Sequence, residues 1–400
     1  MNFARKSNDW KLRNRIKVQA MPGDEFYMAQ AIKLARKGWF STHPNPRVGC
    51  VLVRDEQVIA QGWHQYAGQG HAEVQALADL QHNNATAEGA TAYVTLEPCS
   101  HFGRTPPCSN ALIEAGVKRL VVAMTDPNPL VSGNGIKRLK EHGVEVRVGV
   151  LEADARALNP GFIQRMETQK PLIRCKMAMS LDGRTAMASG ESQWITSPDA
   201  REDVQTLRAE SSAVLTGIGT VLADNPSMNV RSQRFADNNR QPDRVILDTR
   251  LRIPLDAKLL SLDGQTVICT STESKQQSRK IQALEARGVE IYFLNTQKSG
   301  SRRVLSVNEL MTVLEQRQYN EILLEAGATL GGALLNAGVV DELIIYMAPH
   351  LMGSDARGLF HIPGLDRMSQ RIQLDIRDIR AVGRDFRITA RVRSVTEQQE

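Results

Sequence analysis

Residues 71–80 read HAEVQALADL, and residues 90–108 read ATAYVTLEPCSHFGRTPPC. The apolar, β-branched and aromatic run Ala90–Glu97 predicts a short buried strand, which Pro98 ends. The prolines at 106 and 107 predict the start of a helix that carries Cys108 in its first turn and ends at Gly116. His71 opens another predicted helix. A strand that alternates with helices is typical of an α/β domain.

These junctions carry the residues of a metal site. One imidazole (His71) and two thiols (Cys99 and Cys108) supply three ligands, which leaves a tetrahedral zinc ion one open position for water. Glu73 lies two residues from a ligand and is not needed as one, so it is free to pass a proton from that water to a leaving amine. This H-x-E…P-C pattern is that of zinc-dependent base deaminases, with Glu73 as the catalytic residue.

The alternative is that these are unrelated residues. Each of them alone is more often a surface helix residue, a solvated carboxylate or an ordinary buried thiol, but their type, order and local structure agree jointly with a metal site. The spacing of the two thiols departs from the general pattern. That pattern is P-C-x-x-C, whereas residues 100–107 separate the two thiols here.

Composition limits the class of protein. The chain has 400 residues, 42% hydrophobic and 24% charged, which is ordinary for two or three globular domains. A net charge of +6 suits an anionic small molecule, while the 5% aromatic content and the lack of a basic run with interleaved aromatics do not indicate nucleic-acid binding. Five cysteines argue against a disulfide framework, and no apolar run is long enough for a membrane span.

The order of predicted elements divides the chain. Residues 1–22 form a basic segment without the apolar core of a secretory signal; it is either a disordered arm or sequence upstream of a start at Met21. We place a zinc deaminase domain over residues 23–169 and a second domain over residues 170–400. Lys170-Pro171, after a polar helical stretch, marks the boundary.

The first half alternates helices with five predicted strands, which favours a three-layer α/β/α domain. Its first helix is predicted to bury Phe26, Ala29, Ile32 and Ala35 on one face. The second half alternates similarly from Leu172, but its last two predicted strands (342–349 and 384–394) follow one another without a clear helix, so we expect a mixed sheet.

A glycine-containing turn follows a predicted strand in the second half. Residues 325–332 read EAGATLGG, and such glycines let backbone N–H groups approach a phosphate at a helix N-terminus. The turn is not G-x-G-x-x-G, which argues against a standard Rossmann domain. Taken alone, such a glycine cluster is more often simply a tight strand-to-helix turn.

Several motifs together resemble one known family. They are HPNPRVG (43–49), HAEV (71–74), TLEPCSHFGRTPPC (95–108), SLDGRTAMA (180–188), ESQWIT (191–196), VLADNP (221–226) and the turn at Gly327. From about Asp24 to Arg393 the chain resembles the bifunctional deaminase–reductases of riboflavin biosynthesis. The long spacing between the two thiols is this family's own form.

The resemblance implies two consecutive reactions and two cofactors. A cytidine-deaminase-like first domain with Zn²⁺ would hydrolyse the amino group of 2,5-diamino-6-ribosylamino-4(3H)-pyrimidinone 5′-phosphate. A dihydrofolate-reductase-like second domain, a mixed sheet with flanking helices, would use NADPH to reduce the ribosyl group of 5-amino-6-(5-phosphoribosylamino)uracil to ribityl. The partners would be phosphorylated pyrimidines, with no nucleic acid or membrane, in a cytoplasmic homo-oligomer, dimer or tetramer.

The resemblance also implies binding residues, position by position. Those matching substrate contacts are Asn45, Lys176, Ser192, Arg208, Met228, Arg231 and Glu325. Those matching nucleotide contacts are Ala178, Trp194, Thr220, Asp224, Gly327, Ala328, Thr329, Leu330, Gly331, Gly332 and Ala333. Guanidinium groups pair well with phosphate oxygens, which suits the two arginines. Asn45 is alternatively a turn residue, Trp194 a core residue, and each arginine a solvated charge.

Two rival functions stay open on the sequence. One is a single-function nucleoside or tRNA deaminase with an appended structural domain, and the other is a zinc-stabilised binding module.

No residue is an obvious general acid for the reduction, with Lys176 and Glu325 as the candidates. Ala328 stands where the family commonly has proline.

Overall fold

The computed structural model describes residues 23–82, 85–100, 106–129, 131–236, 240–299 and 302–393. The predicted basic arm over residues 1–22 and the motif residues 101–105 lie outside the described residues.

The first half contains a five-stranded sheet in the order β2-β1-β3-β4-β5. Its strands are β1 (Gly49–Arg54), β2 (Gln57–Trp63), β3 (Thr91–Val94), β4 (Arg119–Val122) and β5 (Glu145–Val148). β1 is antiparallel to β2 and β3, and β3, β4 and β5 are parallel to one another. The strand predicted over residues 90–97 is shorter than expected: β3 ends at Val94, where the chain turns towards Cys99.

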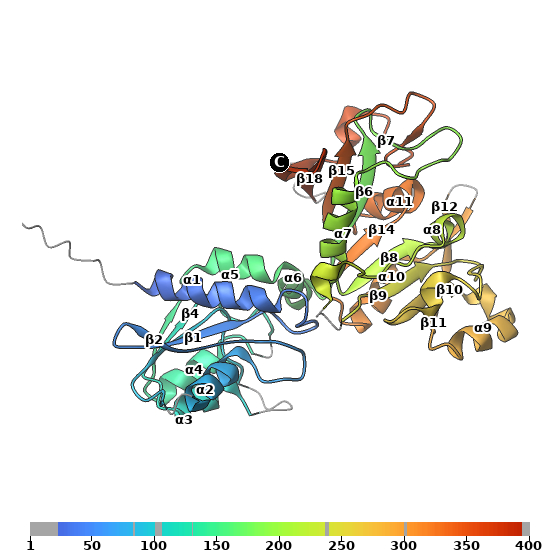
Figure 1. The fold of residues 1–400 in the computed structure, drawn as a ribbon. Coiled ribbons are helices and arrows are strands. Elements are labelled where there is room, and N and C mark those ends of the chain that lie inside the picture. The colour runs from blue at the N-terminus through green and yellow to red at the C-terminus, as the bar shows by residue number, and fades with distance from the viewer. Residues whose placement is uncertain are drawn as a thin grey trace, which may run out of the picture.

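Helices cover both faces of this sheet, as the predicted three-layer arrangement requires (Figure 1). On one face lie α1 (Asp24–Ala35) and α5 (Glu152–Leu158); on the other lie α2 (Ala72–His82), α3 (Cys108–Glu114) and α4 (Asn134–Glu141). The 3-10 helix η1 (Arg36–Gly38) continues α1. The polar stretch before the predicted boundary forms two helices, α5 and α6 (Pro160–Thr168), because Asn159 leaves the helical conformation and Pro160 starts a new helix.

The prediction of which residues α1 buries was wrong in part. Phe26 is 54% exposed and Ala29 is also exposed, whereas Ile32 and Ala35 are buried as expected. The buried face includes the neighbours Tyr27 and Met28. A strict spacing of three residues drifts around a helix that turns once every 3.6 residues, so it leaves the face that packs on β1 and β3.

The second half contains a nine-stranded sheet in the order β11-β10-β9-β8-β14-β6-β15-β18-β17. Its strands are β6 (Leu172–Ser180), β8 (Ala213–Gly217), β9 (Asp243–Leu247), β10 (Thr266–Ser271), β11 (Glu290–Leu294), β14 (Glu321–Glu325), β15 (Glu342–Ala348), β17 (Leu374–Val382) and β18 (Asp385–Val392). All pairs from β11 to β15 are parallel, and β18 is antiparallel to both its neighbours. The predicted mixed sheet is confirmed.

One strand of this sheet was not predicted. β17 lies at the edge, and both Ile376 and Ile379 are exposed. The apolar residues therefore give no alternation between a buried and a solvated face, which is the usual sequence signal for a strand.

Helices and short elements complete the second half. The helices are α7 (Pro198–Glu210), α8 (Ile218–Asp224), α9 (Ser278–Glu285), α10 (Val307–Gln316), α11 (Ala328–Asn336) and the 3-10 turns η2 (Gln233–Phe235), η3 (Lys258–Ser261), η4 (Thr272–Gln276) and η5 (Met368–Gln370). Two small antiparallel pairs join β7 (Arg184–Ala186) to the distant β16 (Arg357–Gly358), and β12 (Thr296–Ser299) to the next strand, β13 (Arg302–Leu305).

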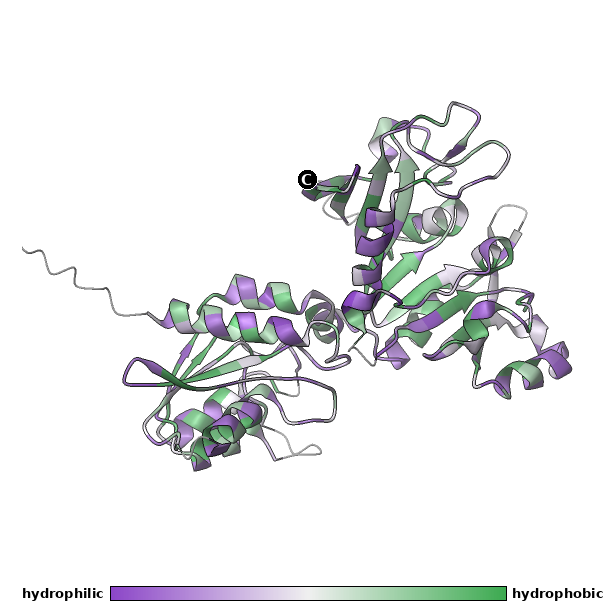
Figure 2. Ribbon diagram, in the orientation of Figure 1, coloured by the Kyte–Doolittle hydropathy of each residue, from purple (hydrophilic) through white to green (hydrophobic). Residues whose placement is uncertain are grey.

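Each half has its own apolar core. One buried cluster draws only on residues between Tyr27 and Ile163, and a second draws on residues between Ile173 and Ile345. Figure 2 shows the apolar colour concentrated on the strands of both sheets and the polar colour on the outer sides of the helices. Separate cores fit two domains, and the exact boundary at residues 169 and 170 stays a prediction.

Candidate active sites

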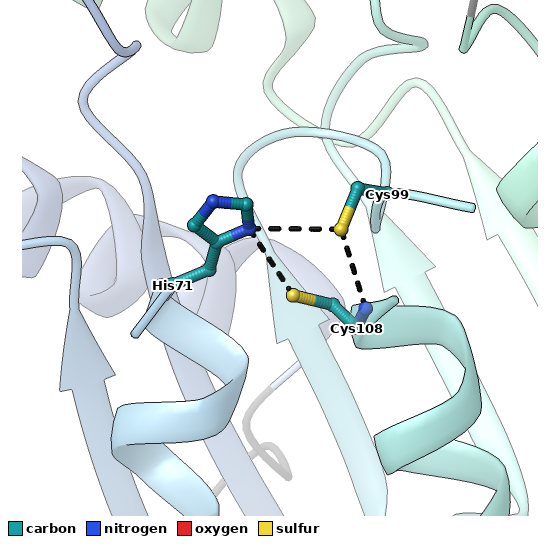
Figure 3. Close-up of side chains that lie close together, drawn as sticks. All are labelled: His71, Cys99 and Cys108. Carbon is teal, nitrogen blue, oxygen red and sulfur yellow. Dashed lines mark hydrogen bonds between the residues drawn. The ribbon is translucent and has the colours of Figure 1, made fainter. Parts of the chain in front are cut away.

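Three helix or strand ends bring the predicted metal ligands together in the first domain. His71 directly precedes α2, where its carbonyl accepts a hydrogen bond from the N–H of Gln75. Cys108 is the first residue of α3, and Cys99 lies on the segment that follows β3. Figure 3 shows all three side chains pointing to one place.

The distances fit a tetrahedral zinc ion. Nδ1 of His71 lies 3.6 Å from Sγ of Cys99 and 3.3 Å from Sγ of Cys108, and the three ligand atoms lie within 4.8 Å of one another. Zinc bonds of about 2.3 Å to sulfur and about 2.0 Å to nitrogen place such ligands roughly 3.5 Å apart. The geometry therefore accommodates the ion without rearrangement.

The surroundings favour a thiolate at Cys99. A hydrogen bond with the Cys108 thiol lowers the pKa of Cys99 and outweighs the effect of burial; the His71 imidazole lowers the pKa further. The backbone N–H of Cys108 also donates to Sγ of Cys99 over 3.2 Å. Deprotonated thiols are what zinc binds, so these donors prepare the site for metal.

Glu73 lies in the first turn of α2 and is only 3% exposed. Burial raises the pKa of its carboxyl group from 4.5 to about 7, and this is partly opposed by the neighbouring His71. Its carboxyl group also hydrogen-bonds with the Cys108 thiol, so it borders the metal ligands. A carboxyl group that changes protonation near neutral pH can both accept and return a proton.

Two supporting residues of this site were missed on the sequence. His64 packs edge-to-face against His71 with ring centroids 5.4 Å apart, and it hydrogen-bonds with Asn45. Glu97 is buried two residues before Cys99 and accepts hydrogen bonds from four backbone N–H groups between residues 126 and 136. Its place in the motif TLEPC was visible, but its partners were not.

Three predicted substrate residues meet in the second domain. Lys176 on β6 and Glu325 on β14 are paired in register on neighbouring parallel strands. Arg208 on α7 binds Glu325 through two hydrogen bonds, Nε to Oε1 over 2.6 Å and Nη2 to Oε2 over 2.8 Å. Burial lowers the pKa of Lys176, and the nearby Glu325 partly offsets this effect. Burial would raise the pKa of Glu325, but the positive charges of Arg208 and Lys176 hold that pKa below its ordinary value.

The remaining predicted substrate residues lie around this cluster at different distances. Nη1 of Arg208 donates to the carbonyl of Asn229, so this guanidinium is largely committed to protein groups. Arg231 is exposed, and partial burial and the nearby Arg208 lower its pKa. Met228 is buried with a positive φ of 50°. Ser192 makes no side-chain hydrogen bond to any other described residue, so the structure does not join it to the cluster.

Several of the predicted nucleotide residues lie near the carboxyl ends of the parallel strands β6 and β8, which flank β14. Ala178 is on β6, and Thr220 and Asp224 are on α8, which follows β8. Oδ1 of Asp224 accepts a hydrogen bond from the side chain of Gln193 over 3.3 Å. Trp194 is 66% exposed and stacks with the Arg201 guanidinium at 4.4 Å, so it is not a core residue. The carboxyl edge of a parallel sheet is where α/β folds bind ligands.

The glycine turn also lies at this edge. Gly327 precedes α11, and residues 328–333 form its first turns. A Cβ atom at Gly332 would lie 2.3 Å from the backbone oxygen of His361, so any larger residue would push this helix away from the segment beside it. The close approach explains this glycine by packing, whereas Gly327 has no atom near the place of a Cβ and leaves room above the helix end.

Two family models match different parts of the chain. Residues 21–124 match the family model for the cytidine and deoxycytidylate deaminase zinc-binding region, and residues 171–388 match the model for the RibD C-terminal domain. The riboflavin biosynthesis protein RibD of Escherichia coli is 49% identical over 372 residues, which cover 90% of this chain and 97% of that protein. The Haemophilus influenzae protein of the same name is 46% identical and covers 92% and 96% of the two chains.

Solved structures show the same architecture. A structure of Acinetobacter baumannii RibD is similar with a TM-score of 0.83 at 45% identity, covering 92% of this chain and 99% of that one. A diaminohydroxyphosphoribosylaminopyrimidine deaminase/5-amino-6-(5-phosphoribosylamino)uracil reductase from Thermotoga maritima is similar with a TM-score of 0.80 at 33% identity, with the same coverage. None of the described helices has both the length and the apolar character required to cross a bilayer.

Proposed function

The chain belongs to the RibD family of bifunctional deaminase–reductases, and on that premise we propose which of its residues perform each reaction. The protein catalyses two consecutive steps of riboflavin biosynthesis, with Zn²⁺ and NADPH as cofactors. The first is hydrolytic deamination of 2,5-diamino-6-ribosylamino-4(3H)-pyrimidinone 5′-phosphate. The second reduces the ribosyl group of 5-amino-6-(5-phosphoribosylamino)uracil to ribityl. We assign deamination to residues 23–169 and reduction to residues 170–400.

In the deaminase domain His71, Cys99 and Cys108 would hold the zinc ion, which when bound would act as a Lewis acid and make a water molecule more acidic. Glu73 is the catalytic residue. Its buried carboxylate takes a proton from the attacking water and, now neutral, returns it to the leaving amine. Burial raises the pKa of this carboxyl group and so favours the protonated form that hands the proton on. Asn45 orients the pyrimidine beside this group.

In the reductase domain Lys176, Ser192, Arg208, Met228, Arg231 and Glu325 bind the substrate. NADPH would be held by residues 178, 194, 220, 224 and 327–333, and when bound it would supply the hydride. Arg231 is the better placed of the two arginines for the phosphate, because Glu325 already occupies two donors of Arg208. The ion pair instead fixes the Glu325 carboxylate beside Lys176, whose pKa is lowered by burial, so Lys176 can give up a proton more readily than an exposed lysine.

One observation carries the deaminase assignment: three metal-binding atoms within 4.8 Å of one another, with a buried carboxyl group in contact with one of them. The test supplies the phosphorylated diaminopyrimidine and NADPH in one tube and follows ammonia and the nicotinamide absorbance together. We expect ammonia first, then substrate-dependent oxidation of NADPH. Ammonia without any oxidation of NADPH would instead support a single-function deaminase with an appended structural domain.

Two further properties are proposals on family resemblance. We propose that the protein works in the cytoplasm as a homo-oligomer, a dimer or tetramer. Light scattering coupled to gel filtration measures the mass directly, and a monomer at micromolar concentration would refute the oligomer.

A further inference from the structure

A loop of the deaminase domain, residues 43–47, is held by residues of the reductase domain. Nδ2 of Asn320 donates to the carbonyl of Pro44 over 3.0 Å. Oδ1 of the same amide accepts from Nε of Arg165 over 2.7 Å. Because the guanidinium can only donate, this second bond fixes the orientation of the amide and directs its N–H group towards the loop.

A second hydrogen bond holds the same loop from the reductase side. Oγ of Ser212 accepts from the backbone N–H groups of Asn320 and Glu321, over 3.0 and 3.2 Å. Its own proton is therefore available for Nδ1 of His43, which lies 3.0 Å away. Two adjacent loop residues are thus bound from the reductase side: His43 by Ser212, which precedes β8, and Pro44 by Asn320, which precedes β14. Ser212 itself is bonded to the start of β14.

The far end of the loop is fixed by both domains. The backbone of Arg47 exchanges two hydrogen bonds with the Asn159 side chain, over 2.8 and 2.9 Å. Its guanidinium donates to the carbonyl of Leu158 over 2.7 Å and contacts Glu321 at 3.4 Å. The loop is therefore anchored on either side of Asn45, the residue to which we assign a substrate contact.

Asn45 is linked to the metal ligand His71 through His64. Nδ1 of His64 lies 3.2 Å from the carbonyl of Gly70 and must donate to it, so Nε2 is the acceptor for Nδ2 of Asn45 at 3.1 Å. His64 in turn packs on His71. This orientation leaves Oδ1 of Asn45 without a hydrogen bond from the described residues and available to a substrate amino group.

We propose that Asn320, in the reductase domain, is a positioning residue for the deamination reaction: it fixes the Pro44 carbonyl and thereby the place of Asn45 beside the zinc site. The inference rests on the proposed substrate contact of Asn45. It makes the deaminase pocket dependent on a residue of the other domain, although the two reactions use separate sites.

The test is the full-length Asn320→Asp variant. A carboxylate keeps the acceptor for Arg165 but turns the donor that faces Pro44 into a second oxygen, which the Pro44 carbonyl repels. We expect kcat/KM for deamination to fall roughly tenfold. Most of this fall should come from a higher KM, because the displaced residue, Asn45, binds substrate. The zinc ion and Glu73 are untouched by the change. Zinc content and both kinetic constants for reduction should equal those of the unmutated protein.

The matched control is Asn336→Asp, which makes the same change at an exposed position at the end of α11 and should alter neither reaction. Asn320→Ala, which removes the donor without adding charge, should shift the deamination KM in the same direction. Unchanged deamination in both Asn320 variants would overturn the proposal. So would parallel loss of both activities, or loss of zinc, because these indicate a general structural defect.

A double-mutant cycle separates this inference from the function on which it rests. In an Asn45→Ala background, Asn320→Asp should have no further effect on deamination, since its target is already gone. An undiminished effect in that background would sink the positioning role. Normal deamination by Asn45→Ala alone would refute the substrate contact itself, whereas impaired Asn45→Ala with normal Asn320→Asp would refute only the role of Asn320.

Discussion

Replacement of Glu97 by glutamine should damage the deaminase site without touching any residue that contacts metal or substrate. The buried carboxylate accepts from the backbone N–H groups of Asp126, Gly133, Gly135 and Ile136, at 3.2, 2.9, 2.9 and 3.2 Å. Each oxygen serves two of these donors. A carboxamide keeps one of the two oxygens but replaces the other with an NH₂ group. The two backbone N–H groups that faced the replaced oxygen are then left without an acceptor.

The size of the effect follows from the number of lost bonds. A buried N–H group left without a partner costs about 1–3 kcal/mol, so two of them cost about 2–6 kcal/mol of domain stability. The neighbouring backbone cannot easily compensate, because a Cβ atom at Gly135 would lie only 2.0 Å from the Pro98 carbonyl, so these segments are already in close contact. Since Cys99 follows Pro98 directly, we also expect faster loss of zinc to a chelator.

The assay measures the urea concentration at which each activity is half lost. With an m-value of about 2 kcal/mol per M, the deamination midpoint should fall by about 1–3 M. The reduction midpoint should stay, because the reductase core is separate. The control Glu114→Gln, at an exposed position on α3, should shift neither midpoint. An unchanged deamination midpoint in Glu97→Gln would refute this account of the four hydrogen bonds.

Three further predictions concern other groups. Glu73→Gln should keep zinc and reduction but slow ammonia release by roughly 10²–10⁴-fold, the usual contribution of general acid–base catalysis; metal analysis beside both activity assays checks this, and normal ammonia release would contradict the assigned role. Arg208→Ala should lower reduction by at least about tenfold, because it releases Glu325 from its ion pair, and should spare deamination; loss of both in a folded, zinc-loaded protein would contradict the two-site picture. Asp24→Asn should destabilise the deaminase domain at pH 7 by about 1 kcal/mol, a value reduced for screening by solvent. Hydrogen bonds from Arg119 lower the pKa of Asp24 from 3.8 to about 2, so its stabilisation is present above pH 4 and is lost as the pH falls towards 2. Unfolding curves of the two proteins at several pH values should therefore converge in acid, and a difference that does not depend on pH would refute the ion pair as its cause.

The amino-acid sequence by itself determined the chemistry of the first site. His71, Glu73, Cys99 and Cys108 were recognisable because each side chain carries its own chemistry and each stands at a helix or strand end marked by proline or by a change of periodicity. The alternation of strands and helices likewise comes from local patterns, so the layered first domain and the mixed second sheet could both be predicted.

Only the tertiary structure decided which groups support these sites. The buried face of α1 depends on the sheet beneath it, and β17 is a strand only because β18 offers it an edge. The bond between Asn320 and Pro44 joins residues 276 positions apart. Pro44 lies in the motif HPNPRVG, but nothing in that motif or around Asn320 indicates that the two residues are partners. Hydrogen bonds of this kind are set by the packing of one domain on the other, which periodicity and motif spacing along a single chain do not encode.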